Sequence, residues 1–208
     1  MRAFWLGLAV VAMAVAARAS DEADVKVGDW VKIRKTEIGT WLSDGLQMTV
    51  LERVKVIENG MAIIDIKTTE QYPGGNDPIV ASWDEKIPLA RLDSAVRYVD
   101  WDQVKREMKT LRIREANGNQ AVEVSGGIFA NILWRKAMIT IETEDGQIAE
   151  WMVIEQWRDD EAPFVMARQL KATVVMTKST PQGLAGSWTT MERVAYGRAG
   201  DPIPDDSD

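Results

Sequence analysis

The sequence has 208 residues, of which 46% are hydrophobic and 27% charged, and its formal net charge at pH 7 is −7. This composition is typical of a globular domain and excludes a collagenous, disordered or membrane-embedded chain. The chain contains no cysteine and no histidine. It therefore has no disulfide, no thiol nucleophile, no Ser-His-Asp triad and no histidine or cysteine ligand for zinc.

The N-terminus has the three parts of an export signal. Arg2 precedes an apolar run over residues 3–17, and Ala17-Arg18-Ala19 ends it with small residues at both cleavage-determining positions. A membrane anchor is the alternative, but the run is shorter than the roughly 20 residues that cross a bilayer. We expect residues 1–19 to be a signal peptide, cleaved before Ser20, and the protein to be periplasmic or secreted with no transmembrane segment left.

Loss of Arg2 and Arg18 would leave 23 basic residues against 32 acidic ones, so the net charge would move from −7 to −9. An acidic chain lacks the positive face that neutralises phosphates, so we expect no nucleic-acid partner. Basic residues do concentrate between Arg91 and Arg114. A solvated helix face and an anion-binding patch are both compatible with that stretch.

Alternation of apolar and polar residues dominates the mature chain and predicts β-strands. In the first half, the predicted strands span residues 30–36, 47–57, 61–69 and 79–87. Asn59-Gly60 separates the second from the third, and this pair favours a tight hairpin because both residues tolerate a positive φ.

One helix is expected over residues 92–109, where Asp100 or Asp102 can cap a segment with helical spacing of apolar residues. Beyond it, the predicted strands span residues 111–115, 120–124, 128–143, 148–157, 164–177 and 186–196. Asn117-Gly118-Asn119 is the expected turn between the first two of these strands.

The connections between neighbouring strands are short or moderate, which permits antiparallel pairing. About ten strands and one helix predict a mainly β fold, a single antiparallel sheet that curls into a half-barrel or folds into a sandwich. Residues 20–197 are expected to form one β domain. Residues 198–208 are rich in aspartate and are expected to be a disordered acidic tail.

The carboxylates form no recognisable metal or catalytic site. Asp100 and Asp102 are interpreted as helix caps because no further ligands follow at the spacing of a calcium loop. Residues 159–161, Asp-Asp-Glu, are interpreted as solvated residues of a hairpin loop. We therefore expect no metal and no cofactor.

Ser-Lys catalysis is the hydrolytic scheme that the absence of histidine leaves open. Ser82 and Lys86 are separated by three residues rather than the two of the S-x-x-K signature, and they fall in a predicted strand. Ser187 lacks the second glycine of a nucleophile elbow. The sequence thus predicts no catalytic residue and a protein that is not an enzyme.

Glu52 falls on a strand face otherwise formed by Met48, Val50, Val54 and Val56. One interpretation is a carboxylate inside a cavity, with a raised pKa or a cationic partner. The other is a local bulge, or a position beyond the edge of the core.

Tryptophan is unusually frequent, with nine in the chain against three phenylalanines and three tyrosines. Bulky indoles can line an apolar cavity, form a platform for sugars or simply fill the core of a curved sheet. The cavity hypothesis rests on alternating residues in strands expected to be neighbours. Its proposed lining residues are Trp134, Met138, Trp151, Val153, Val174 and Met176.

The opening segment Val27-Gly28-Asp29-Trp30-Val31 resembles that of uncharacterised secreted bacterial proteins, as do Gln156-Trp157-Arg158-Asp159-Asp160, Ala162-Pro163 and residues 165–168. The layout of long antiparallel strands with one helix also resembles the lipoprotein-carrier superfamily, the LolA- and LolB-like proteins, whose half-barrel encloses acyl chains. That resemblance implies a shape and a periplasmic setting. No functional residue of those carriers matches a position in this chain.

These observations favour an exported, non-enzymatic β-protein that holds an apolar ligand or a lipid or peptide segment of a partner. A structural or protein-interaction domain with a filled core is the alternative. A carboxylate-dependent enzyme acting on envelope polysaccharide is the third hypothesis.

Export gives the first testable prediction. N-terminal sequencing of the protein from the cell envelope should begin at Ser20 or a neighbouring residue, because the small residues at 17 and 19 fit the cleavage site. A soluble cytoplasmic protein that keeps Met1 would contradict it.

Overall fold

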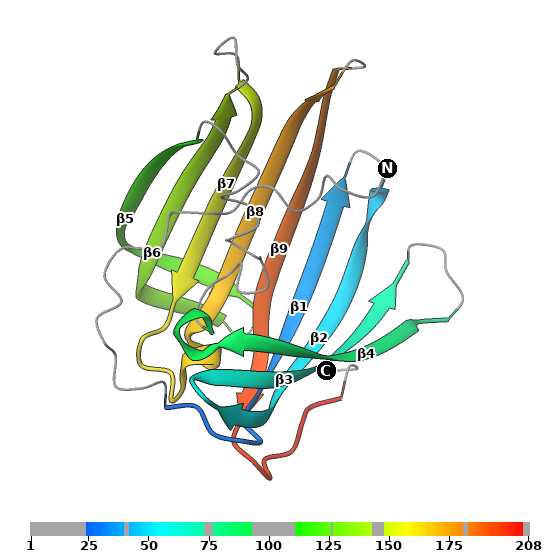
Figure 1. Ribbon diagram of the computed structural model, residues 1–208, viewed down its shortest axis with the longest axis vertical. Coiled ribbons are helices and arrows are strands. Elements are labelled where there is room, and N and C mark those ends of the chain that lie inside the picture. Colours follow the sequence, from blue (N-terminus) through cyan, green and yellow to red (C-terminus); the bar gives the residue numbers. More distant parts are fainter. Residues whose placement is uncertain are drawn as a thin grey trace.

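The computed structural model describes residues 24–39, 42–72, 77–92, 111–125, 127–142, 148–180 and 183–205. They form one antiparallel sheet of nine strands (Figure 1). The strands are β1 (Trp30–Gly39), β2 (Leu42–Glu58), β3 (Met61–Gln71), β4 (Ile79–Pro88), β5 (Leu111–Val124), β6 (Gly127–Glu142), β7 (Ile148–Arg158), β8 (Gln169–Thr180) and β9 (Gly183–Gly197). Within these residues the helical elements are two short 3-10 turns, η1 (Leu89–Arg91) and η2 (Val165–Arg168).

The strand order is β4-β3-β2-β1-β9-β8-β7-β6-β5, and the sheet is not closed. Among the described strands, all pairings join sequence neighbours except the pairing of β1 with β9, and the neighbours β4 and β5 lie at opposite edges. The sheet is therefore two meanders, β1–β4 and β5–β9, joined through the first and last strands. These two strands lie at its centre and β4 and β5 at its edges.

The predicted single curled antiparallel sheet is confirmed, as an open curved sheet. It has nine strands rather than ten because residues 111–124 form one continuous strand. The expected turn at 117–119 is paired throughout, with Gly118 opposite Trp134. Both flanking segments pair with the same long strand β6, and this pairing overrides the local turn preference. The expected signal peptide, and the expected helix apart from Leu92, lie outside the described residues.

The β2–β3 hairpin is confirmed. Asn59 and Gly60 have φ values of 50° and 73°, as a tight hairpin requires. The register shifts between Val54 and Val56, so Val56 turns outward and is 36% exposed, while Ile57 packs on the core instead. β2 therefore contains a β-bulge, as one interpretation of Glu52 expects, but the bulge begins at Val54, two residues after Glu52.

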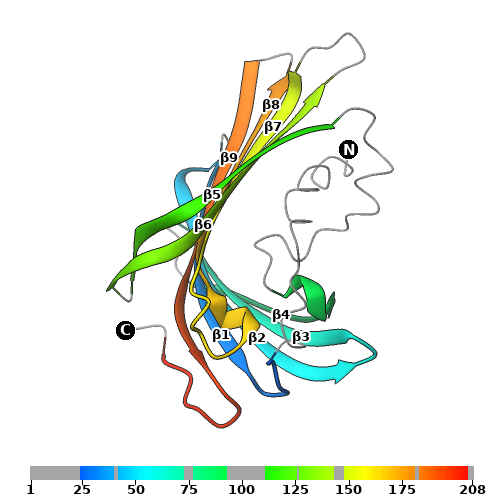
Figure 2. The ribbon, with the colours of Figure 1, turned by 90° about the vertical axis from the view of Figure 1, so that its left-hand side faces the viewer.

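The sheet is strongly curved, with the β3–β4 hairpin and the far ends of β5–β8 bending toward the same side (Figure 2). The main core lies on this concave face, where Val31, Ile33, Ile64 and Ile66 pack against the β7–β8 loop that carries Phe164 and η2. Burial of this apolar surface is the dominant force that bends the β3–β4 hairpin over the loop.

The convex face is covered in part by the tip of the β5–β6 hairpin, which passes behind the sheet in Figure 1. The Nη1 of Arg34 donates to Ser125 Oγ at 2.8 Å, and Ser125 Oγ donates to Glu192 at 3.3 Å. Beneath the tip, Val122, Val124 and Leu170 form a second apolar cluster.

The acidic tail also lies on the convex side, over its described residues 198–205 (Figure 2). Lys32 is 5% exposed, and its Nζ donates to the backbone oxygens of Pro204 at 2.6 Å and Asp205 at 2.9 Å. These contacts join Pro204 and Asp205 of the tail to β1.

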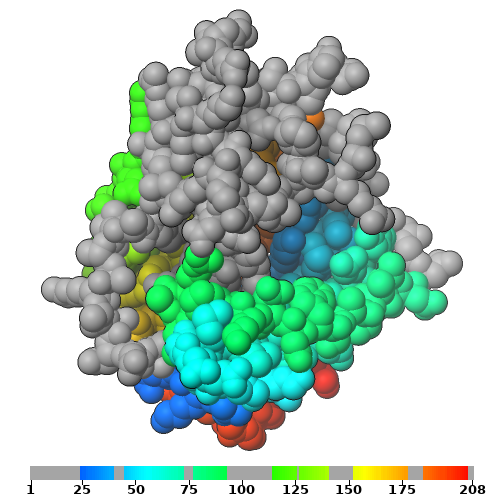
Figure 3. Space-filling view, in the orientation of Figure 1, coloured from blue at the N-terminus to red at the C-terminus, as the bar shows by residue number. Residues whose placement is uncertain are grey.

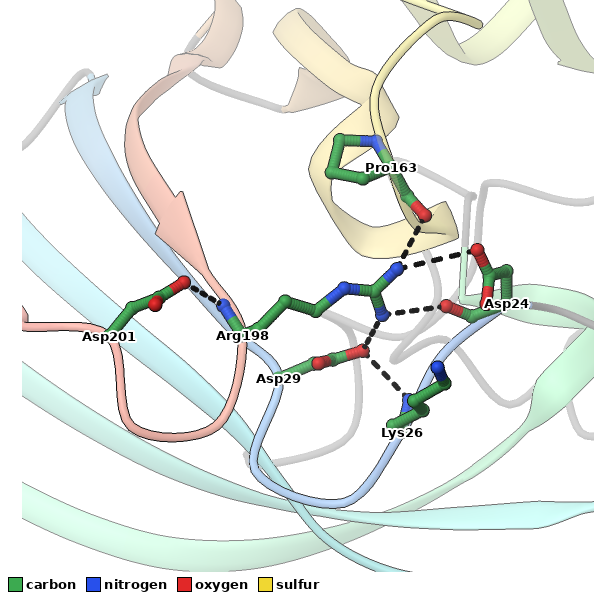
Figure 4. A network of polar contacts seen from close by, with 6 residues as sticks. All are labelled: Asp24, Lys26, Asp29, Pro163, Arg198 and Asp201. Atoms are coloured by element: carbon green, nitrogen blue, oxygen red, sulfur yellow. Dashed lines mark hydrogen bonds and ion pairs between the residues drawn. The ribbon is translucent and has the colours of Figure 1, made fainter.

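An ion pair locks the junction of β1 and β9 (Figure 4). Asp29, 1% exposed, accepts hydrogen bonds from Arg198 Nη1 at 2.6 Å and from the backbone N–H of Lys26 at 2.7 Å. Arg198 also donates to the backbone oxygens of Asp24 and Pro163, at 2.9 and 2.8 Å. One guanidinium thereby ties the N-terminal segment, the end of β9 and the β7–β8 loop together.

Close packing of glycines completes this junction. A Cβ on Gly197 would lie 2.6 Å from the indole of Trp30, so only glycine allows the ring to cover the backbone there. Gly28 has a φ of +90°, and a Cβ on it would lie 2.5 Å from the Cβ of Ala199. The Gly28-Asp29-Trp30 motif thus serves the pairing of β1 with β9.

A second arginine, Arg193 of β9, anchors the same loop. Arg193, 8% exposed, donates to the backbone oxygen of Ala167 and to Asp159 at 3.3 Å. Its guanidinium also lies 4.7 Å from the ring centre of Tyr196. Both arginines hold the loop that fills the lower concave face.

Gly197→Ala should lower the free energy of unfolding by about 1–3 kcal/mol, because the added methyl must displace the buried indole of Trp30. Gly118→Ala is the matched control: a Cβ there meets nothing within 4 Å. Alanine at that strand position should leave stability unchanged or raise it by up to about 1 kcal/mol. Urea unfolding of both variants makes the comparison, and equal stabilities would contradict the packing argument.

Arg198→Ala should lower the free energy of unfolding by about 3 kcal/mol, because it leaves the buried carboxylate of Asp29 without its cation. Arg114→Ala, which removes an exposed arginine of β5, should change it by no more than about 0.5 kcal/mol. Thermal and urea unfolding measure both. Similar effects from the two variants would mean that the Asp29 pair is not a stabilising lock.

Candidate functional site: the concave face of β6–β8

Strands β6, β7 and β8 present two register rows of apolar residues on the concave face. Ala137, Ile154 and Val174 form one row, and Ile139, Met152 and Met176 form the other. Ala137, Ile139, Met152 and Ile154 are 0–5% exposed, whereas Val174 and Met176 are half-buried. An apolar surface thus runs across three neighbouring strands where the sheet bends.

Polar side chains border this surface on the next two strands. The first row continues through Thr189 of β9 to Glu37 of β1. Glu37 pairs with Lys35 at 3.1 Å, and both side chains are nearly 30% exposed. A ligand with an apolar chain on β6–β8 would therefore meet a zwitterionic pair at β1, which can bind a polar head.

The structure divides five of the six residues predicted to line a cavity between the two faces of the sheet. Val174 and Met176 lie on the concave face. Trp134, Met138 and Val153 share the convex face, where Trp134 pairs with Trp157 and Met138 with Val153. Trp151 pairs in register with Thr140 and Thr177, and its side chain lies outside the described residues.

Four concave residues were not in the predicted set: Ala137, Ile139, Met152 and Ile154. Ala137 and Ile139 belong to the second of two apolar faces in residues 128–143, which the alternation itself displays. The pattern shows two apolar faces, and the direction of curvature decides which of them becomes concave. That direction depends on long-range packing.

The convex tryptophans have a structural role. The indole Nε1 atoms of Trp157 and Trp134 lie 2.7 and 3.1 Å from the side-chain amide of Gln120, whose oxygen accepts from both when the amide is so oriented. This bridge links β5, β6 and β7 beneath the hairpin tip. It satisfies two indole donors that partial burial would otherwise leave unpaired.

Glu52 is 2% exposed and lies opposite Val31 and Ile66, residues of the main concave core. It is therefore not beyond the edge of the core. Its side chain belongs to the floor of the lower concave face, away from the β6–β8 surface.

The other sequence candidates are held in structural contacts. Asp159 pairs with Arg193 at 3.3 Å and Asp160 with Arg158 at 3.2 Å. Ser82 donates to Asp65 at 3.5 Å, whereas Lys86 pairs with Glu58 at 3.7 Å, so the two are not joined as a Ser-Lys pair. Asp100 and Asp102 lie outside the described residues. Within those that are described, no group of three acidic, histidine or cysteine side chains could hold a metal.

Two exposed groups have perturbed pKa values. The hydrogen bond and charge of Asp84, 2.7 Å away, raise the pKa of Lys55. The hydrogen bond to Glu70 likewise raises the pKa of Tyr72. Both belong to β2–β4 and neither lies at the concave surface of β6–β8.

Comparison with known proteins assigns no family. No protein-family model and no curated protein matches the chain. Among solved structures, a DUF1329 family protein from Desulfovibrio piger is similar over 88% of this chain and 89% of its own, with 9% identity and a TM-score of 0.23. A TM-score of this size assigns neither fold nor function. No helix among the described residues is long and apolar enough to span a membrane.

Proposed function

We propose that this is an exported β-protein that holds the apolar chain of a ligand on the concave face of β6–β8. The observation that carries the proposal is the pair of register rows Ala137–Ile154–Val174 and Ile139–Met152–Met176. The six side chains lie in register across three strands and form one continuous apolar surface, whose half-buried members are Val174 and Met176. The export signal expected in residues 1–19 supports an envelope setting.

The chemistry of the surface favours an aliphatic chain. Methionine and branched aliphatic side chains adapt to a flexible chain and offer it no hydrogen bond. Each buried methylene contributes about 0.8 kcal/mol, so even a medium-length chain can be held without a specific polar contact. The ion pair of Lys35 and Glu37 at the border then orients the polar end of the ligand.

No part of this function requires catalysis. The chain has neither histidine nor cysteine, and Asp159 and Asp160 of the β7–β8 loop pair with Arg193 and Arg158. We therefore propose a binding role, with a lipid or a lipidated segment of a partner as the ligand.

Calorimetric titration with fatty acids of increasing length tests the proposal. Affinity should rise about fourfold per added methylene, the equivalent of about 0.8 kcal/mol, until the surface is filled and then stay constant. No saturable binding at any length would leave a filled-core interaction domain as the better description.

Val174→Lys should weaken this binding at least tenfold, because it replaces an apolar contact of about 1.5 kcal/mol with a charge. Val175→Lys is the matched control: it changes the next residue of the same strand, also a half-buried valine, on the convex face opposite Trp188. It should leave the affinity unchanged. Equal losses from the two variants would contradict binding on the concave face.

A further inference from the structure

The edge strand β4 has an exposed apolar half. Ile79, Val80 and Trp83 are 55%, 57% and 44% exposed, and every side chain from Ile79 to Asp84 is exposed. β4 lies at the end of the strand order, so one side of its backbone has no strand partner among the described residues. Figure 3 shows it at the molecular surface.

The two edges of the sheet differ in protection. β5 exposes Arg114 and Glu115 near its start and polar residues along its centre, and such charges discourage pairing with another strand. Between Ile79 and Trp83 the β4 edge carries no charge, no proline and no bulge. Unpaired backbone N–H and C=O groups flanked by apolar side chains are the features that recruit a further strand.

The charges that follow Trp83 are mostly satisfied within the subunit. Asp84 pairs with Lys55 at 2.7 Å, and Lys86 pairs with Glu58 at 3.7 Å. The edge therefore offers main-chain hydrogen bonds and apolar contacts rather than a net charge that would select an acidic or basic partner. A strand of the same character as β4 is the partner that fits it.

We infer that β4 pairs with β4 of a second copy of this chain, antiparallel and around a two-fold axis at Trp83. Such a two-fold axis is perpendicular to the sheet, so the sheet keeps the same two faces in both subunits. Two residues that face each other across the axis must have side chains on the same face, and an axis placed between two residues would put them on different faces. The register must therefore be centred on a residue. Two criteria select this residue: which charged side chains oppose each other across the axis, and how many residues of the two β4 strands are paired.

Centred on Trp83, the pairing extends from Ile79 to Ile87, and every charged residue faces an uncharged one. Asp84 faces Ser82, Glu85 faces Ala81 and Lys86 faces Val80. Centring on Asp84 or Glu85 would oppose two carboxylates at the axis, which is unfavourable. Centring on Ser82 or Ala81 shortens the paired segment and separates the two indoles.

Trp83 and its symmetry mate then lie opposite each other, on the face that carries Ile66 of β3. Directly opposed side chains in an antiparallel pair have Cβ atoms about 4.5–5.5 Å apart, close enough for indoles to pack together. The dimer would thus bury the exposed indole of Trp83 and extend the sheet across two subunits.

Sedimentation of the purified chain tests the inference. It should show a concentration-dependent doubling of mass. Trp83→Lys should weaken the dimer about a hundredfold, because it opposes two ammonium groups at the axis. Trp188→Lys is the matched control, since Trp188 is 53% exposed but lies on the central strand β9. A monomer at all concentrations, or a dimer equally weakened by both changes, would overturn the inference.

Cysteine cross-linking tests the register, since the chain has no cysteine of its own. A mixture of the Ala81→Cys and Glu85→Cys variants should give a disulfide-linked dimer under mild oxidation, because these positions face each other across the axis. Either variant alone should cross-link little, since its two thiols lie about 14 Å apart along the strands. Efficient cross-linking of Ala81→Cys with itself would place the axis elsewhere and refute the Trp83-centred dimer.

Discussion

The two meanders form one sheet because β1 pairs with β9. Among the described strands, every other pairing joins sequence neighbours. This one joins the two ends of the domain, where Asp29 and Arg198, which flank β1 and β9, are 169 residues apart in the sequence. Closing so long a loop costs chain entropy before any contact is gained. The buried ion pair and the fit of Trp30 over Gly197 offset that cost at one end of the two strands, where the arginine also fixes the β7–β8 loop.

That junction explains how the faces of the sheet are covered. With the loop fixed by Arg198 and Arg193, Phe164 and η2 fill the lower concave face, and the β3–β4 hairpin bends over them. The β5–β6 tip covers part of the convex face with its own apolar cluster. The remaining concave rows of β6–β8 and the apolar half of β4 are the two surfaces to which we assign binding.

The sequence predicts what depends on local pattern. Alternation identified the strands, and Asn59-Gly60 identified a hairpin whose positive φ angles the structure confirms. Asn117-Gly118-Asn119 failed as a turn because pairing with β6 is stronger than local preference. The predicted lining residues were split between the faces because alternation in residues 128–143 gives two apolar faces, and only tertiary curvature tells them apart. The pairing of β1 with β9 had no local signal, although Gly28 and Asp29 of the junction stand in the opening motif.

We propose that the concave face of β6–β8 holds an aliphatic chain in the cell envelope. Native mass spectrometry of the protein recovered from its own envelope, without added lipid, tests it most directly. We expect an added mass equal to one acyl-chain-bearing molecule, which is lost on denaturation and reduced in the Val174→Lys variant. The mass of the bare polypeptide in every preparation would contradict it.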